Sequence, residues 1–93
     1  MMLRDDQRIT IREEVLSRQL DGEAVLLDLQ SGTYFGLNEI GALVWDLVSA
    51  GKTVGEIRVG LLEAYEVEPE VVDADLERLI DDLQRRGLVD LST

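Results

Sequence analysis

The hydrophobic pattern of this sequence changes its period once, near Asn38, and this change limits the kinds of elements the chain can form. Before Asn38, apolar and polar residues alternate loosely in short runs that are separated by glycine-containing pairs. After Asn38, apolar residues recur at intervals of three and four, which is the spacing of one face of an α-helix. The pattern predicts an α+β fold in which an N-terminal antiparallel sheet is followed by helices.

Two glycine pairs divide the first part of the chain into three expected strands. Asp21-Gly22 is the strongest hairpin signal, because both central residues of a type I′ turn need positive φ. Ser31-Gly32 gives the second turn. The sequence therefore predicts a three-stranded meander over residues 9–20, 23–30 and 33–37.

This meander has apolar side chains on both faces. If both turns contain two residues, one face carries Leu16, Val25, Leu27, Leu29 and Tyr34, and the other carries Leu26, Phe35 and Leu37. Helices cover one face of a three-stranded sheet in so small a domain. The second apolar face is either wrapped by another part of the chain or left for a partner.

Three helices are expected after the sheet. Asn38 suits the cap of the first helix, and Thr53 with Glu56 forms a capping box at the start of the second. Pro69 suits the first turn of the third helix, and Gly87 fits a left-handed position just after its end. Three helices with a hairpin sheet form a winged-helix-like arrangement, and we expect residues 1–93 to make a single domain.

The charge balance limits the partners of such a domain. The 93 residues include 9 Lys or Arg and 20 Asp or Glu, which gives a formal net charge of -11. This charge repels nucleic acid and anionic membranes, and the third expected helix is itself acidic. It also opposes self-association, so we expect a monomer that binds neither DNA nor membranes.

The sequence offers little for catalysis or metal binding. It has no Cys and no His, which excludes disulfides, thiolate zinc sites and His-dependent triads. Asp81 and Asp82 lie four residues before Arg85 and Arg86, as on a solvated helix face. We therefore expect no enzymatic activity, no metal and no cofactor, and the lack of a targeting or membrane-spanning segment predicts a soluble cytoplasmic protein.

The third expected strand, residues 33–37, is the most exposed part of the meander. As its last strand it has an edge of unpaired backbone groups, unless the chain termini cover it. The strand contains no Lys, no Pro and no inward charge, which are the usual protections of a sheet edge. The edge is therefore a candidate docking site for an extended peptide.

Positions across residues 15–90 resemble the PqqD family, which is named for the coenzyme PQQ biosynthesis protein D. The stretch SGTYFGLN at residues 31–38 carries the resemblance most strongly. The other matching positions are Gly41, Val44-Trp45, Gly51-Lys52-Thr53, Glu56-Ile57, Tyr65, Val72, Asp75-Leu76, Leu79-Ile80, Leu83 and Gly87-Leu88-Val89.

This resemblance implies a winged-helix-like recognition element for ribosomally synthesised, post-translationally modified peptides (RiPPs). Members of the family bind the leader of a precursor peptide and deliver it to modifying enzymes. A member of this size is similar to the leader-binding half of the split B protein in lasso-peptide clusters. The implied partners are the precursor leader, a cysteine-type leader peptidase and an ATP-dependent cyclase similar to asparagine synthetase.

The resemblance also implies a site. Leaders in this family add a strand to the third strand of the sheet and lie in the cleft between that strand and the third helix. The implied main-chain side is Thr33, Tyr34, Phe35, Gly36 and Leu37, and the implied helix side is Val72, Asp75, Leu76, Leu79, Asp82 and Leu83.

Three alternatives stay open at this point. The first is a peptide chaperone for a radical SAM enzyme in PQQ-type biosynthesis. The second is a winged-helix transcription regulator, which would need a basic surface for DNA. The third is a toxin–antitoxin or scaffold partner that binds a folded protein through the same sheet edge.

Overall fold

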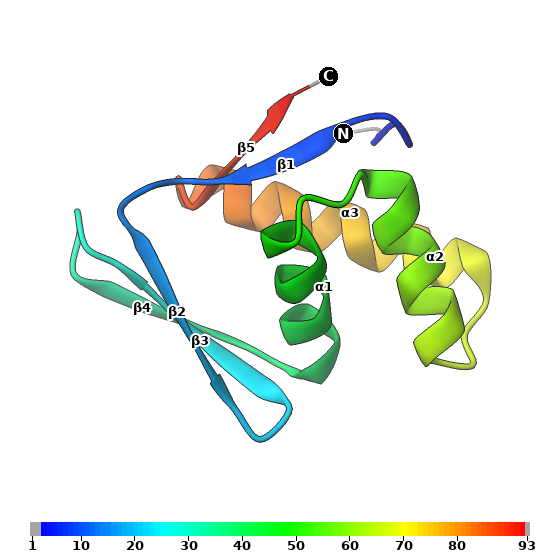
Figure 1. Ribbon diagram of the computed structural model, residues 1–93, viewed down its shortest axis with the longest axis horizontal. Helices are drawn as coiled ribbons and strands as arrows, with labels where there is room; N and C mark the ends of the chain where they lie inside the picture. Colours follow the sequence, from blue (N-terminus) through cyan, green and yellow to red (C-terminus); the bar gives the residue numbers. More distant parts are fainter. Residues whose placement is uncertain (1–2, 93) are drawn as a thin grey trace.

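The computed structural model describes residues 3–92 and contains two small sheets and three helices (Figure 1). The larger sheet is antiparallel with the order β2-β3-β4, formed by Val15–Leu20, Glu23–Asp28 and Thr33–Leu37. The smaller sheet pairs β1 (Arg8–Ile11) with β5 (Val89–Ser92). The helices are α1 (Glu39–Ser49), α2 (Val54–Ala64) and α3 (Pro69–Arg85). The predicted α+β fold with a three-stranded sheet and three helices is confirmed.

The predicted turn at Asp21-Gly22 is confirmed. Both residues have positive φ, 42° for Asp21 and 84° for Gly22, and the flanking residues Leu20 and Glu23 are paired. The hairpin of β2 and β3 therefore has a two-residue loop with the backbone that a type I′ turn requires.

The prediction of a two-residue turn at Ser31-Gly32 is wrong. Asp28 pairs with Thr33, so the loop between β3 and β4 contains four residues. The Asp28 carboxylate ends the strand early, because it accepts hydrogen bonds from the Gln30 backbone N–H (3.0 Å) and the Ser31 hydroxyl (2.9 Å). The register moves by two residues, which preserves the faces of the strands.

The prediction of one continuous strand over residues 9–20 is also wrong. A turn at residues 12–14 separates β1 from β2, and the Val15 N–H donates to the Arg12 carbonyl at 3.1 Å. β1 then pairs with β5, placing Ile9 opposite Leu91 and Ile11 opposite Val89. This pairing joins the two ends of the chain, so β5 leaves the β4 edge uncovered.

The helices cover one face of the larger sheet. On that inner face Ala24, Leu26 and Leu37 are buried against a core that includes Trp45. On the outer face Leu16 is 52% exposed and Tyr34 is 68% exposed. No described part of the chain wraps the outer face.

The helix ends follow the sequence signals. Asn38 accepts a hydrogen bond from the Gly41 N–H at 2.9 Å, and Thr53 and Glu56 form the predicted capping box. Hydrogen bonds from the backbone and side chain of Thr53 hold the pKa of Glu56 below its usual value. At the end of α3 the Leu88 N–H donates to the Leu83 carbonyl at 3.0 Å, which completes a Schellman motif around Gly87.

Candidate functional site

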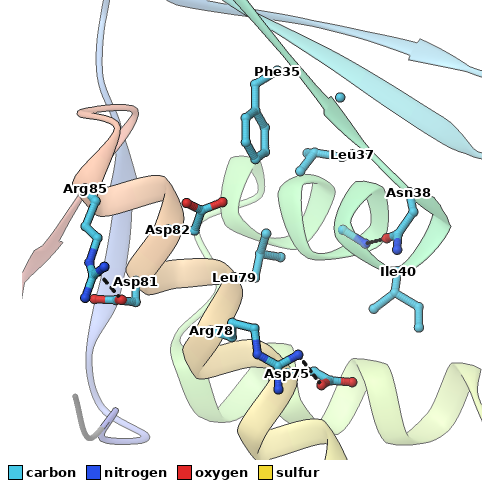
Figure 2. Close-up of a pocket in the computed structure, with 12 residues that line it drawn as sticks. Phe35, Leu37, Asn38, Ile40, Asp75, Arg78, Leu79, Asp81, Asp82 and Arg85 are labelled. Atoms are coloured by element: carbon cyan, nitrogen blue, oxygen red, sulfur yellow. Dashed lines mark hydrogen bonds and ion pairs between the residues drawn. The ribbon is translucent and has the colours of Figure 1, made fainter.

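A cleft of about 670 Å³ lies between β4 with the start of α1 on one side and α3 on the other (Figure 2). Its first wall is one continuous segment of chain, because α1 begins two residues after β4 ends. Its second wall is the face of α3 that is turned toward β4. The lining residues are Phe35, Gly36, Leu37, Asn38, Ile40, Gly41, Asp75, Arg78, Leu79, Asp81, Asp82 and Arg85.

The backbone of β4 has hydrogen-bonding groups free along this cleft. The Leu29 N–H donates to the Glu14 carbonyl at 2.8 Å, which fixes the phase of the pairing between β3 and β2. Because the two edges of a central antiparallel strand alternate, the even-numbered residues of β3 bond to β4, opposite Thr33, Phe35 and Leu37. The N–H and C=O groups of Tyr34 and Gly36 therefore point to the open edge.

In β4, the residues whose side chains point into the cleft are different from the residues whose backbone groups are free. Phe35 and Leu37 point toward α3, whereas Tyr34 lies on the outer face of the sheet. Leu79 enters the cleft from α3, opposite this strand (Figure 2). An added strand would thus meet hydrogen-bonding groups at the sheet edge and apolar side chains below it.

Charged residues of α3 line the cleft as local ion pairs. Arg78 pairs with Asp75 at 3.3 Å and Arg85 pairs with Asp81 at 3.1 Å (Figure 2). Next to the cleft, Arg86 pairs with Asp82 at 3.2 Å and places its guanidinium 4.5 Å from the centre of the Phe35 ring. This cation–π contact joins the end of α3 to β4.

The structure brings six of the implied site residues together in the cleft and places five elsewhere. The cleft contains Phe35, Gly36, Leu37, Asp75, Leu79 and Asp82. Thr33 is exposed at the start of β4, and Tyr34 contributes its backbone but not its side chain. The remaining three are buried, with exposures of 5% for Val72, 2% for Leu76 and 1% for Leu83, and Val72 and Leu76 also line a small pocket that adjoins the cleft.

Six lining residues were absent from the implied site: Asn38, Ile40, Gly41, Arg78, Asp81 and Arg85. The sequence contained a signal for each group. The first three follow β4 directly, so a strand added to β4 runs past them. Arg78 and Arg85 lie three residues after Asp75 and Asp82, and helical periodicity places them along the same side of α3. Asp81 lies four residues before Arg85, with which it pairs.

This arrangement is suited to binding. The cleft is open and offers a sheet edge, apolar side chains and paired charges. The described residues contain no group of three or more His, Cys, Asp or Glu that could hold a metal ion. None of the described helices is long and apolar enough to cross a membrane.

Comparison with known proteins agrees with this geometry. Two solved structures match with TM-scores of 0.84 and 0.81. The first, "TbiB1 in Complex with the TbiA(beta) Leader Peptide", is 37% identical and covers 87% of this chain and 94% of its own. The second, "Lasso peptide synthetase B1 complexed with the leader peptide", is 30% identical and covers 89% of this chain and 98% of its own.

The comparison of sequences gives the family. A search of curated protein sequences finds no significant match. The family model described as "Coenzyme PQQ synthesis protein D (PqqD)" matches residues 23–89, a span that runs from β3 through α3 to the start of β5. The chain therefore belongs to the PqqD family.

Proposed function

We propose that this chain is a RiPP recognition element that binds the leader of a ribosomally made precursor peptide, of the lasso-peptide class. The leader adds an antiparallel or parallel strand to the free edge of β4 and places alternate side chains in the cleft. The chain then presents the precursor to a leader peptidase and to a cyclase. It performs no chemistry itself, so its contribution is affinity and position.

One observation carries this proposal: the free backbone groups of Tyr34 and Gly36 lie along the edge of an apolar cleft. Such an edge satisfies the backbone of an extended peptide, while pockets for alternate side chains give specificity. The lasso-peptide assignment is supported by the two similar structures, which are both leader-peptide complexes.

The interface in this proposal is small. A strand of about five residues on β4 buries less than the roughly 1,200 Å² of a stable protein–protein complex. We therefore expect a dissociation constant in the micromolar to high-nanomolar range, about -8 to -9 kcal/mol. Affinity in this range suits a domain that must release the leader after processing.

The experiment is a calorimetric titration with the leader segment of a short precursor peptide, chosen by inspecting the open reading frames next to this chain's gene. The control is a peptide of the same composition in scrambled order. We expect saturable one-to-one binding of the leader and at least roughly tenfold weaker binding of the scrambled peptide, because pocket positions are lost. Equal binding of the two peptides, or no binding of either, would contradict the proposal.

A further inference from the structure

The cleft continues past the end of β4 onto an apolar surface that we call the apolar extension, formed by Ile40, Tyr65, Val67 and Val71. Ile40 is 39% exposed, Val67 is 40% exposed and Val71 is 48% exposed. These residues surround a small pocket of about 40 Å³, which shares Ile40, Asp75 and Leu79 with the main cleft. A peptide strand that runs past Leu37 therefore reaches the apolar extension without leaving the protein surface.

The chain that forms most of the apolar extension is acidic. Residues 59–77 contain no Lys or Arg and seven acidic residues: Glu63, Glu66, Glu68, Glu70, Asp73, Asp75 and Glu77. Asp73 pairs with Arg58, and Asp75 pairs with Arg78. Glu77 lies in another pocket, beside Leu3 and Arg58, and the other four glutamates form no ion pair with any described residue.

Glu39 extends this acidic border to the α1 side. Its carboxylate accepts a hydrogen bond from the Tyr65 hydroxyl at 3.2 Å. Desolvation and this hydrogen bond to Glu39 both raise the pKa of Tyr65, so the hydroxyl stays a neutral donor. Tyr65 thus supplies an apolar ring and leaves the negative charge of the border unchanged.

The two ends of the cleft differ in whether their acidic side chains are paired with basic ones. At the Phe35 end, Asp81 and Asp82 are matched by Arg85 and Arg86 on the same helix. At the apolar extension the glutamates have no such partners within residues 3–92. A ligand that spans the cleft therefore meets a nearly neutral surface at one end and a negative surface around exposed valines at the other.

We infer that the leader carries basic residues in the part that runs past Leu37, with apolar side chains on the apolar extension and Lys or Arg heads at the surrounding glutamates. This inference rests on the proposed function and adds the chemistry of the ligand. Long basic side chains suit the surface, because their aliphatic stems cover apolar area while their charged ends reach carboxylates. The same attraction speeds association.

The test is selection of a displayed library of random 15-residue peptides on the folded protein. Glu66→Gln with Glu70→Gln neutralises two exposed glutamates at the apolar extension. Glu13→Gln with Glu14→Gln is the matched control, because it removes the same charge at the exposed turn between β1 and β2. Circular dichroism and thermal melting first establish that both double variants are folded.

The wild type and the control should enrich peptides that have an alternating apolar segment and Lys or Arg on one flank only. The Glu66/Glu70 variant should enrich the apolar segment without the basic flank. A selected basic-flank peptide should bind that variant about threefold to tenfold more weakly than the wild type, and its affinity should depend less on salt.

The other outcomes separate this inference from the proposed function. Enrichment of alternating apolar peptides without a basic flank on the wild type would overturn the inference and leave leader binding intact. A basic flank that persists on the Glu66/Glu70 variant, or disappears equally on the control, would also overturn it. Failure to enrich any extended peptide on the wild type would contradict the proposed function itself.

Discussion

The two sides of α3 have nearly the same sequence spacing but different environments. One side, which we call the core stripe, consists of Val72, Leu76, Ile80 and Leu83, and all four are at most 5% exposed. The other side, the cleft stripe, consists of Asp75, Leu79 and Asp82, which line the cleft. The core stripe holds the helix on the sheet and on its neighbours, whereas the cleft stripe is free to contact a ligand.

With the proposed binding site, stability and binding become separable on one helix. A substitution in the core stripe removes packing that holds the domain together, and at Ile80 or Leu83 it does not alter the lining of the cleft or of the small pocket beside it. A substitution in the cleft stripe or at the β4 edge changes the surface offered to a peptide at little cost to the core. Variants on the two sides should therefore differ in which quantity changes most.

The largest expected effect is in the core stripe. Ile80→Ala should lower the free energy of unfolding by about 2–5 kcal/mol, because it leaves a cavity in place of a side chain that is 0% exposed. Chemical denaturation measures this loss. The folded fraction should bind leader with unchanged affinity, because Ile80 lines neither the cleft nor the small pocket beside it, and a variant of native stability that binds poorly would move Ile80 to the binding surface.

The next effect is in the cleft stripe. Leu79→Glu should weaken leader binding by about 1–3 kcal/mol, because a carboxylate would be desolvated against apolar leader side chains. Calorimetry measures binding, and melting checks the fold. Val59→Glu is the control, since Val59 is a 52% exposed residue of α2 outside the cleft. Wild-type affinity in folded Leu79→Glu would contradict the assignment of the cleft stripe.

A third effect concerns the sheet edge that faces the cleft stripe. Gly36→Pro removes one edge N–H and should weaken leader binding by about 0.5–1.5 kcal/mol, while an edge position tolerates proline in the fold. Gly36→Ala is the control, because it keeps the N–H and its added Cβ has no atom of the described residues within 4 Å. Equal binding by the two variants would exclude this N–H from leader recognition.

The smallest effect is at the end of α3. Arg86→Gln removes the cation–π contact with Phe35 and should lower the free energy of unfolding by about 0.5–1 kcal/mol. The measurement is chemical denaturation of Arg86→Gln and of Arg85→Gln. Both variants lose one positive charge, but only Arg86→Gln loses the cation–π contact, so the difference between them reports on the contact. Identical losses in the two variants would assign the effect to charge alone.

The sequence predicted local features well and long-range ones poorly. Asp21-Gly22, the Thr53 capping box and the Gly87 helix end depend on residues close in the chain, and each prediction is confirmed. The pairing of β1 with β5 joins residues about 80 positions apart, and no local pattern specifies it. The turn after β3 was misjudged because the Asp28 side chain competes with strand pairing.

The same division applies to the site. The edge strand was visible in the sequence because period-two alternation and the absence of protecting residues are local features. The site residues on α3 were harder to predict from the sequence. Leu76 and Leu79 are three residues apart, so helical spacing puts them next to each other on the same surface of the helix. Only the packing of α3 against its neighbours decides that Leu76 is buried and that Leu79 lines the cleft.

The most direct test of strand addition is amide hydrogen exchange of β4, followed residue by residue by NMR with and without saturating leader. The register leaves the amides of Tyr34 and Gly36 free, while those of Phe35 and Leu37 face β3. Leader binding should slow exchange at Tyr34 and Gly36 by roughly tenfold or more and change the other two much less. A leader that binds without protecting Tyr34 and Gly36 would contradict the account.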